Sequence, residues 1–265
     1  MLEQIKTLLD SLAHQNMPKI SEIPPEIGRA AFSSMVALLE KPAPYLKRVE
    51  DRIIEGPNGP IPIRLYDPDP EDKSAKPLIL FFHGGGFVLG DINNYESLTA
   101  SIAERTGFPV ISVEYRLAPE NPFPKGLEDC LHSAKWATHT ASQWLGRPVQ
   151  GFIPMGDSAG GNLAAVVVQE LHKTVPIVAQ VLLYPVTDLA RDHASRTKFG
   201  SGYLLEQREM EFFASCYLGE NTDMKDPRIS PIYGQGLSTL PKTIIVVAEY
   251  DPLHDEGLAL SLIHI

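Results

Sequence analysis

Five short apolar runs, each separated from the next by at least the length of a helix, constrain the fold of this chain more than any other feature. They occupy residues 78–82, 110–113, 152–155, 178–183 and 243–248. Each run is apolar on both faces, which is typical of parallel strands buried between two layers of helices. The sequence therefore predicts an α/β fold with a doubly wound, mostly parallel sheet.

Helix-like segments alternate with these strands, and two further strand-like stretches precede them. The stretches at 49–54 and 61–66 flank the turn Gly56-Pro-Asn-Gly59, which predicts an antiparallel hairpin at one edge of the sheet. The main predicted helices occupy residues 93–106, 126–140, 159–173 and 206–218.

Residues 1–45 form a separate segment before the first strand signal. They are helix-like but interrupted by prolines, which indicates a helical cap appended to an α/β domain over residues 46–259. Apolar residues at helical spacing usually build cores. We therefore expect the apolar side chains of the cap to pack inside it rather than to touch a ligand, and these are Leu8, Leu9, Leu12, Phe32, Met35 and Leu39.

The charge balance and the cysteine content exclude several kinds of partner. The chain has 23 Lys and Arg against 33 Asp and Glu, a net charge of −10, so nucleic acid and anionic membranes would be repelled. No stretch approaches the ~20 apolar residues of a membrane span, and acidic residues interrupt the start where a secretory signal would be apolar. Cys130 and Cys216 form no metal-binding or disulfide pattern, so a cytoplasmic protein is expected.

The motif Gly156-Asp-Ser-Ala-Gly-Gly161 directly follows one predicted strand and opens the next helix. A strand, Gly-x-Ser-x-Gly and a helix form the nucleophile elbow, in which a tight turn exposes the serine hydroxyl at the helix N-terminus. Gly156 and Gly160 would let the strand and the helix approach closely, while Ser158 would adopt a strained backbone conformation. Ser158 is therefore the candidate nucleophile.

A second motif, His83-Gly-Gly-Gly-Phe87, follows the strand predicted at 78–82. Consecutive glycines leave backbone N–H groups unobstructed, and such donors can surround the oxyanion that forms when an ester carbonyl is attacked. The predicted donors are Gly84 and Gly85, with Ala159 as the third. The alternative is a flexible or phosphate-binding loop, but no Gly-Lys-Ser/Thr follows the glycines and no Gly-x-Gly-x-x-Gly is present.

Together with four further motifs, the glycine loop and the serine motif resemble the bacterial hormone-sensitive-lipase-like family of α/β-hydrolase fold carboxylesterases. The resemblance implies a serine esterase for small, short-acyl esters, with an N-terminal helical cap and a triad of Ser158, an aspartate and a histidine. No metal or organic cofactor is expected. The four further motifs are Tyr115-Arg-Leu-Ala-Pro-Glu120, Leu183-Tyr-Pro-Val-Thr-Asp188, Asp226-Pro-Arg-Ile-Ser-Pro231 and Glu249-Tyr-Asp-Pro-Leu253.

The resemblance places the acid of the triad on the loop after the strand at 243–248. Asp251 matches the family position and would orient the histidine and stabilise the imidazolium that forms on proton abstraction. Asp188, which follows the preceding strand, is the second candidate. Asp255 is expected to cap a helix instead.

No histidine is a convincing base for Ser158. His83 lies beside the glycine loop, and in the family it has an architectural role. His254 is only three residues past Asp251, so one loop would have to hold both acid and base. Structural or solvated roles are expected for the histidines further upstream, which are His14, His132, His139, His172 and His193.

The end of the chain departs from the family pattern. In the family, the catalytic histidine follows one more helix and one more strand after the acid, usually as His-Gly-Phe, whereas His264 is too close to Asp251 for that. Residues 255–259 begin the expected helix, and Leu260-Ser-Leu-Ile-His-Ile265 is expected to interrupt it. These six letters match one reading frame of a common transposase sequencing adapter, so we expect residues 260–265 to be a non-native tail.

Three consequences are expected from such a truncation. The catalytic histidine would be absent, which would make the chain a feeble hydrolase. The strand at 243–248 would become an exposed apolar edge. A homo-oligomer that assembles through the missing C-terminal region would also be lost.

Two alternative functions stay open. A deacetylase, lactonase or amidase would use the same serine and glycine loop. A non-catalytic relative would keep both motifs but use the pocket only to bind a small molecule, as hormone receptors of this fold do. In every case the partner is a small molecule, and the cap together with Phe87, Val88 and Tyr203 is expected to shape its pocket.

Overall fold

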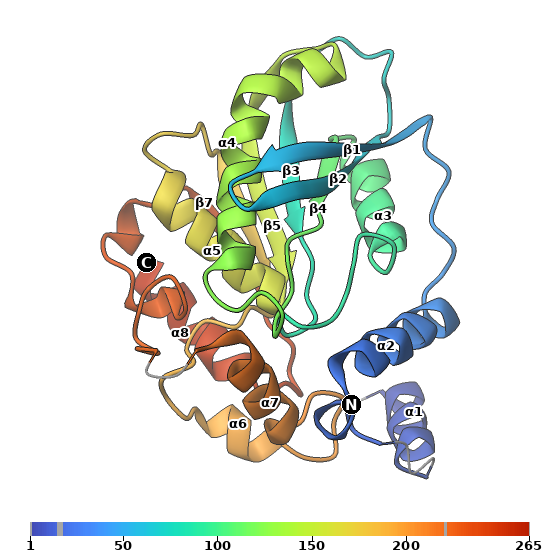
Figure 1. The fold of residues 1–265 in the computed structure, drawn as a ribbon, viewed down its shortest axis with the longest axis vertical. Coiled ribbons are helices and arrows are strands. Elements are labelled where there is room, and N and C mark those ends of the chain that lie inside the picture. Colours follow the sequence, from blue (N-terminus) through green and yellow to red (C-terminus); the bar gives the residue numbers. More distant parts are fainter. Residues whose placement is uncertain (1, 15–17, 220–221, 265) are drawn as a thin grey trace.

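The computed structural model describes residues 2–14, 18–219 and 222–264 and contains one seven-stranded sheet in the order β1-β2-β4-β3-β5-β6-β7 (Figure 1). The first two neighbouring pairs in this order are antiparallel and the remaining four are parallel. The predicted α/β fold and edge hairpin are therefore confirmed. The strands are β1 (Arg48–Gly56), β2 (Gly59–Asp67), β3 (Lys76–Phe82), β4 (Val110–Val113), β5 (Val149–Asp157), β6 (Ala179–Leu183) and β7 (Lys242–Val246).

The four helices predicted between and after the strands are present, with ends that differ by a few residues. None of the helices within the described ranges is both long and apolar enough to cross a membrane. The α-helices are α1 (Glu3–His14), α2 (Pro25–Leu39), α3 (Glu96–Thr106), α4 (Lys125–Leu145), α5 (Ala159–Leu171), α6 (Ala194–Phe199), α7 (Gln207–Tyr217) and α8 (His254–His264). Single 3₁₀ turns occupy Ile20–Glu22, Pro231–Tyr233 and Leu237–Thr239.

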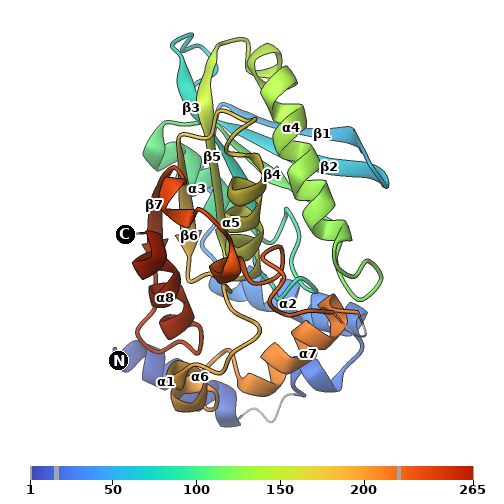
Figure 2. The ribbon, with the colours of Figure 1, turned by 90° about the vertical axis from the view of Figure 1, so that its left-hand side faces the viewer.

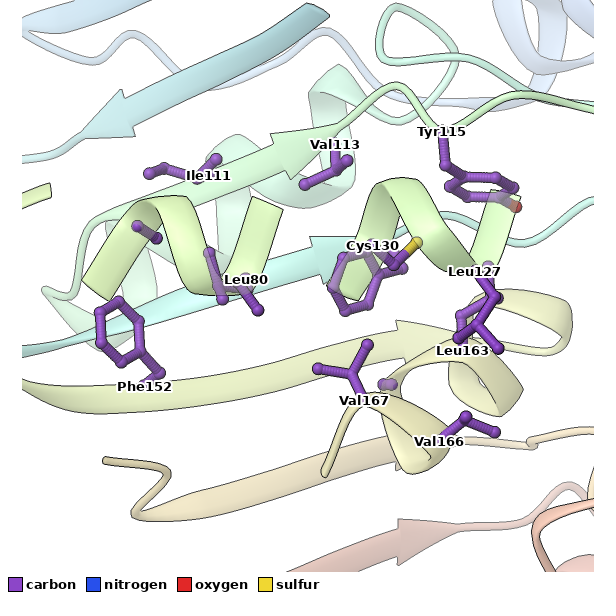
Figure 3. Packing of buried hydrophobic residues seen from close by; sticks show 14 of the residues in the cluster. Leu80, Ile111, Val113, Tyr115, Leu127, Cys130, Phe152, Leu163, Val166 and Val167 are labelled. Atoms are coloured by element: carbon purple, nitrogen blue, oxygen red, sulfur yellow. The ribbon is translucent and has the colours of Figure 1, made fainter. Parts of the chain in front are cut away.

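The central strand β3 sends alternate side chains into two separate apolar cores. Leu80 and Phe82 pack with α4 and α5 on one face of the sheet, which Figure 3 shows from close by. Ile79 and Phe81 pack with Ala100 and other residues of α3 on the opposite face. Because successive side chains of a strand point to opposite faces, a strand covered by helices on both sides must be apolar throughout. This explains the continuous apolar runs of the sequence.

The N-terminal helices lie together with α6 and α7 at one end of the molecule (Figures 1 and 2). Phe32 packs against the larger core and Leu9 is half-buried, but Met35 and Leu39 are exposed over 40% and 54% of their surface. The prediction of internal packing is wrong for those last two residues, because α2 directs one of its apolar sides to solvent. The side chains of Leu8 and Leu12 lie outside the described residues.

One arginine of the cap makes several hydrogen bonds to the sheet domain. Arg29 in α2 donates from Nε to the Val88 carbonyl at 2.8 Å and from Nη2 to the Ala118 carbonyl at 2.9 Å. Its guanidinium also forms a two-bond pair with the Glu120 carboxylate, at 2.9 and 2.7 Å. Since Val88 follows the glycine loop closely, Arg29 links the cap directly to the backbone beside that loop.

Replacing Arg29 with alanine is expected to lower the free energy of unfolding by about 1–3 kcal/mol, because two carbonyls and Glu120 lose their donor. Urea denaturation measures the change. Lys47→Ala is the control, because Lys47 makes only long, exposed contacts with Asp69 and Glu71, at 3.5 and 3.7 Å. It is expected to change stability by less than about 0.5 kcal/mol. Equal losses in both variants would contradict the role given to Arg29.

The last described strand forms an exposed edge of the sheet, as expected. Ile244 and Val246 of β7 are exposed over 52% and 45% of their surface. The expectation that residues 260–265 interrupt the following helix is wrong, however. α8 continues to His264, and Leu260 is completely buried in the larger core. Ile265 and the side chain of His264 lie outside the described residues.

Candidate active site

The serine of the Gly-x-Ser-x-Gly motif lies at the junction of β5 and α5. The backbone of Ser158 has φ 50° and ψ −116°, a region that residues with a side chain rarely adopt. Its N–H donates to the Leu183 carbonyl at 2.9 Å, and its carbonyl accepts the Val186 N–H at 3.1 Å. The predicted strain is therefore confirmed, and the end of β6 helps to hold the serine in this conformation.

The two glycines that flank the serine allow the close approach that the sequence predicts. A Cβ atom on Gly156 would lie 2.4 Å from the backbone of Gly160. A Cβ atom on Gly160 would lie 1.9 Å from the Phe82 carbonyl oxygen and 2.5 Å from that of His83. Real Cβ contacts are never this short, so the start of α5 can touch the end of β3 only without a side chain at these positions.

The structure corrects one predicted oxyanion donor. The Gly84 N–H donates to the Asp157 carboxylate at 2.9 Å, so this N–H already has an acceptor and is not free for an oxyanion. Gly85 and Gly86 have φ 110° and 62°, conformations that glycine adopts without strain. In the described structure the N–H groups of Gly85, Gly86 and Ala159 donate to no acceptor. The Gly84 N–H is therefore occupied, and Gly86, which the sequence did not single out, becomes a candidate donor beside Gly85; an oxyanion at these groups stays a prediction.

The free N–H of Ala159 belongs to the first turn of α5. N–H groups in a first turn have no partner within their own helix, and the helix dipole adds partial positive charge there. This end of α5 is thus suited to an anion that forms at the adjacent Ser158.

The candidate acid Asp251 lies on the loop between β7 and α8 and is partly buried. Burial raises the pKa of its carboxyl group, while the hydrogen bond from the Leu253 N–H, at 2.9 Å, and the nearby His254 oppose this rise. Charge on Asp251 and on Asp157 raises the pKa of the Tyr184 hydroxyl in addition to burial, so both carboxylates lie within electrostatic reach of Tyr184. The role of Asp251 in a triad stays a prediction.

The other two aspartates have structural partners. Asp188 is fully buried, and its carboxylate accepts hydrogen bonds from His193 Nε2 at 3.0 Å and from the Tyr233 hydroxyl at 3.1 Å. Asp255 accepts the Ser195 N–H at 2.8 Å in the first turn of α6. Asp255 therefore caps a helix, as expected, but the helix is α6 rather than its own.

His83 and His254, the histidines beside the glycine loop and Asp251, have hydrogen-bond partners other than Ser158. His83 is buried, donates from Nδ1 to the Gly84 carbonyl at 2.8 Å and stacks on Tyr115. Burial lowers its pKa to about 4, so it is neutral at pH 7. His254 donates from Nδ1 to the Ala248 carbonyl at 2.7 Å. Within the described ranges no histidine is hydrogen-bonded to the Ser158 hydroxyl; the side chains of His14 and His264 lie outside those ranges.

Comparison with known proteins places the chain in a family. The sequence model of the alpha/beta hydrolase fold family matches residues 79–262, which include both glycine motifs and Asp251. The chain is an α/β hydrolase. The resemblance to esterases of this fold is confirmed by its relatives. This chain is 36% identical over 239 residues to the ethyl acetate hydrolase of Pseudomonas putida. It is 40% identical over 237 residues to the carboxylic ester hydrolase LipN of Mycobacterium tuberculosis.

The solved structures agree with this assignment. The hyperthermophilic esterase of the archaeon Pyrobaculum calidifontis superposes with a TM-score of 0.92 at 34% identity, covering 100% of this chain and 85% of the esterase. The alignments with the two bacterial relatives cover 88% and 86% of this chain. The chain itself spans 75% of the length of the ethyl acetate hydrolase and 62% of LipN.

One aromatic residue of this hydrolase covers the glycine loop. A Cβ atom on Gly86 would lie 2.3 Å from the ring of Phe213 in α7, so the phenyl ring is in contact with the Gly86 backbone. Phe213 was not among the predicted site residues, because the sequence around it gives no sign that α7 folds over a loop so distant in the chain.

The predicted pocket residues are arranged differently from the expectation. Phe87 is buried and stacks on Tyr217 with ring centroids 3.8 Å apart, and Val88 is fully buried. They support the loop from within the core. Tyr203 packs against Phe199 and Tyr250, and Tyr250 directly precedes Asp251. No group of three or more His, Cys, Asp or Glu within the described residues is arranged to hold a metal ion.

Proposed function

We propose that this α/β hydrolase cleaves small carboxylic esters through an acyl-enzyme on Ser158. The observation that carries the proposal is the strained Ser158 backbone at the N-terminus of α5, next to free N–H groups of Ala159 and the glycine loop. The names of its relatives, an ethyl acetate hydrolase and a carboxylic ester hydrolase, support an ester as the substrate.

The proposed reaction has two halves. The Ser158 hydroxyl oxygen attacks the ester carbonyl, its proton passes through a base to the departing alcohol, and an acyl-serine remains. Water then attacks the acyl-serine and releases the carboxylic acid. N–H groups of Gly85, Gly86 and Ala159 would stabilise the oxyanion in both halves, and loss of one such donor costs ~2.7–4 kcal/mol. Asp251 would orient a histidine base, which the described residues do not supply. The reaction requires no metal or organic cofactor.

Replacement of the nucleophile tests this proposal. Hydrolysis of 4-nitrophenyl acetate above the buffer rate is expected for the wild-type chain and is expected to vanish in Ser158→Ala, because this variant lacks the hydroxyl that would carry the acyl intermediate. Ser101→Ala in α3 is the matched control and should keep the wild-type rate. Mass spectrometry of the intact protein after brief exposure to the ester should detect one added acetyl group on the wild type and on Ser101→Ala, but none on Ser158→Ala. Equal rates for both variants would contradict the proposal.

A second candidate function is the binding of a small molecule without turnover. It is favoured by the absence of a described histidine at Ser158. A protein of this kind would bind the ester without releasing 4-nitrophenol, and Ser158→Ala would bind it equally well. Turnover of 4-nitroacetanilide in place of the ester would instead indicate an amidase.

A further inference from the structure

A buried carboxylate next to the nucleophile has no role in the reaction described above. Asp157 is the last residue of β5 and is only 6% exposed. One carboxylate oxygen accepts the Gly84 N–H at 2.9 Å, and the other accepts the Tyr95 hydroxyl at 2.9 Å. Both partners belong to segments far from Asp157 in the chain. Burying an ionisable group is costly unless it is fully hydrogen-bonded, so this arrangement requires an explanation.

We propose that Asp157 is a positioning residue, which holds the glycine loop so that the N–H groups of Gly85 and Gly86 face an oxyanion on Ser158. The inference deepens the proposed esterase function and rests on it. Asp157 itself would not touch the substrate.

The glycine loop needs an external hold because its residues lack side chains that would restrict it. Its C-terminal side is fixed by the N–H groups of Val88 and Leu89, which donate to the Gly85 carbonyl at 3.1 and 2.8 Å. Its N-terminal side is fixed by the bond from Gly84 to Asp157. Because three consecutive glycines have wide conformational freedom, loss of either hold would let the free N–H groups change direction.

The position of Asp157 in the sequence makes its hydrogen bond with the Gly84 N–H important for the geometry of the site. Since Asp157 precedes Ser158, one carboxylate ties the loop to the strand that carries the nucleophile. The path from Ser158 to Gly84 at the start of the loop then runs through one peptide unit and one hydrogen bond. Electrostatic stabilisation of an oxyanion depends on such fixed donors.

The protonation states of Asp157 and Tyr95 strengthen the hydrogen bonds to the Asp157 carboxylate at neutral pH. Burial raises the pKa of Asp157 to about 6, and the hydrogen bonds from Tyr95 and Gly84 oppose this rise, so the carboxyl group is ionised above that pH. A carboxylate accepts stronger hydrogen bonds than a neutral group. Burial and the Asp157 charge raise the pKa of Tyr95 well above its usual value, so its hydroxyl stays a donor.

Substitution of Asp157 in the 265-residue chain provides the test, with amide hydrogen exchange at Gly84 and ester turnover as readouts. In Asp157→Ala, exchange at Gly84 is expected to accelerate at least tenfold, and kcat is expected to fall about 10- to 100-fold while KM changes less than about twofold. Asp157→Asn is expected to keep most of the slow exchange at Gly84 and most of the wild-type kcat. Its amide oxygen still accepts from Gly84, and its amide N–H can donate to the Tyr95 oxygen.

Asp188→Ala is the matched control for a lost buried carboxylate. Asp188 is also fully buried and its carboxylate is hydrogen-bonded, but its partners are Ala190, His193 and Tyr233 rather than the glycine loop. It is expected to destabilise the protein without changing exchange at Gly84. If Asp157→Ala does not fold, Tyr95→Phe removes only the supporting hydroxyl and should accelerate Gly84 exchange about threefold or more.

The outcomes separate the inference from the proposed function. Unchanged Gly84 exchange in Asp157→Ala, or in Tyr95→Phe when the former is unfolded, would overturn the inference even if Ser158-dependent turnover is present. The inference is also overturned if exchange accelerates while kcat stays at the wild-type value. If the wild-type chain cleaves no ester, the proposed function fails, and Gly84 exchange alone decides whether Asp157 holds the loop.

Discussion

Hydrolysis of 4-nitrophenyl acetate by the 265-residue chain is expected to be ~10⁴- to 10⁶-fold slower than by a related esterase with a complete triad. The Ser158 hydroxyl is a neutral alcohol and attacks an ester only when a base removes its proton. Within the described residues it has no histidine partner, and the Asp251 carboxylate accepts a hydrogen bond from the Leu253 backbone N–H. The residual rate would come from the free N–H donors and the strained serine. Initial rates at saturating ester measure the deficit.

Added imidazole is expected to recover part of this deficit. A small external base can take the serine proton if the space between Ser158 and Asp251 is open to solvent. Imidazole also cleaves aryl esters directly, so Ser158→Ala measured at each imidazole concentration gives the background to subtract. Turnover of the wild-type chain at the rate of a complete esterase, abolished by Ser158→Ala, would contradict the expectation and would mean that a histidine outside the described side chains reaches the serine.

Most of the fold could be predicted because hydrophobic pattern and turn residues act locally. The apolar runs at 78–82 and 110–113 became β3 and β4, and the glycine turn at 56–59 joined β1 to β2. The prediction failed at α8, where the helix was expected to stop at residue 260. Leu260 continues the helical spacing, and the structure buries it completely.

The candidate site likewise has features that could be predicted from the sequence and one that could not. The strained Ser158 and the close-packed Gly156 and Gly160 follow from one short motif whose steric requirements are local. The direction of each N–H in the glycine loop depends on its partner, and Gly84 finds that partner at Asp157, 73 residues away. A row of identical glycines carries no signal that distinguishes one N–H from the next, so only the folded structure identifies Gly84 as occupied.

Replacing Gly160 with alanine is expected to lower the free energy of unfolding by about 3 kcal/mol or more, although the residue is in a helix. Alanine in place of glycine normally stabilises a helix by ~1 kcal/mol. Here the added Cβ would lie 1.9 Å from the Phe82 carbonyl oxygen, which belongs to backbone that is fixed by the sheet. Forcing atoms into a filled core costs 1–3 kcal/mol and occasionally more, so the usual sign reverses. Urea denaturation measures the change.

Gly28→Ala is the matched control, because Gly28 is also a buried glycine within a helix. Its Cβ would meet Leu89 and Ile20 side chains at 3.5 and 3.6 Å, which are ordinary contacts, so this variant is expected to be up to ~1 kcal/mol more stable than wild type. Comparing the two variants separates the effect of helix propensity from the effect of the close contact between α5 and β3. If Gly160→Ala folds by moving α5 away from β3, Ser158 moves away from the glycine loop, and the Ser158-dependent rate must fall as well. Stabilisation of both variants by a similar amount would show that the contact between α5 and β3 is looser than the glycines indicate.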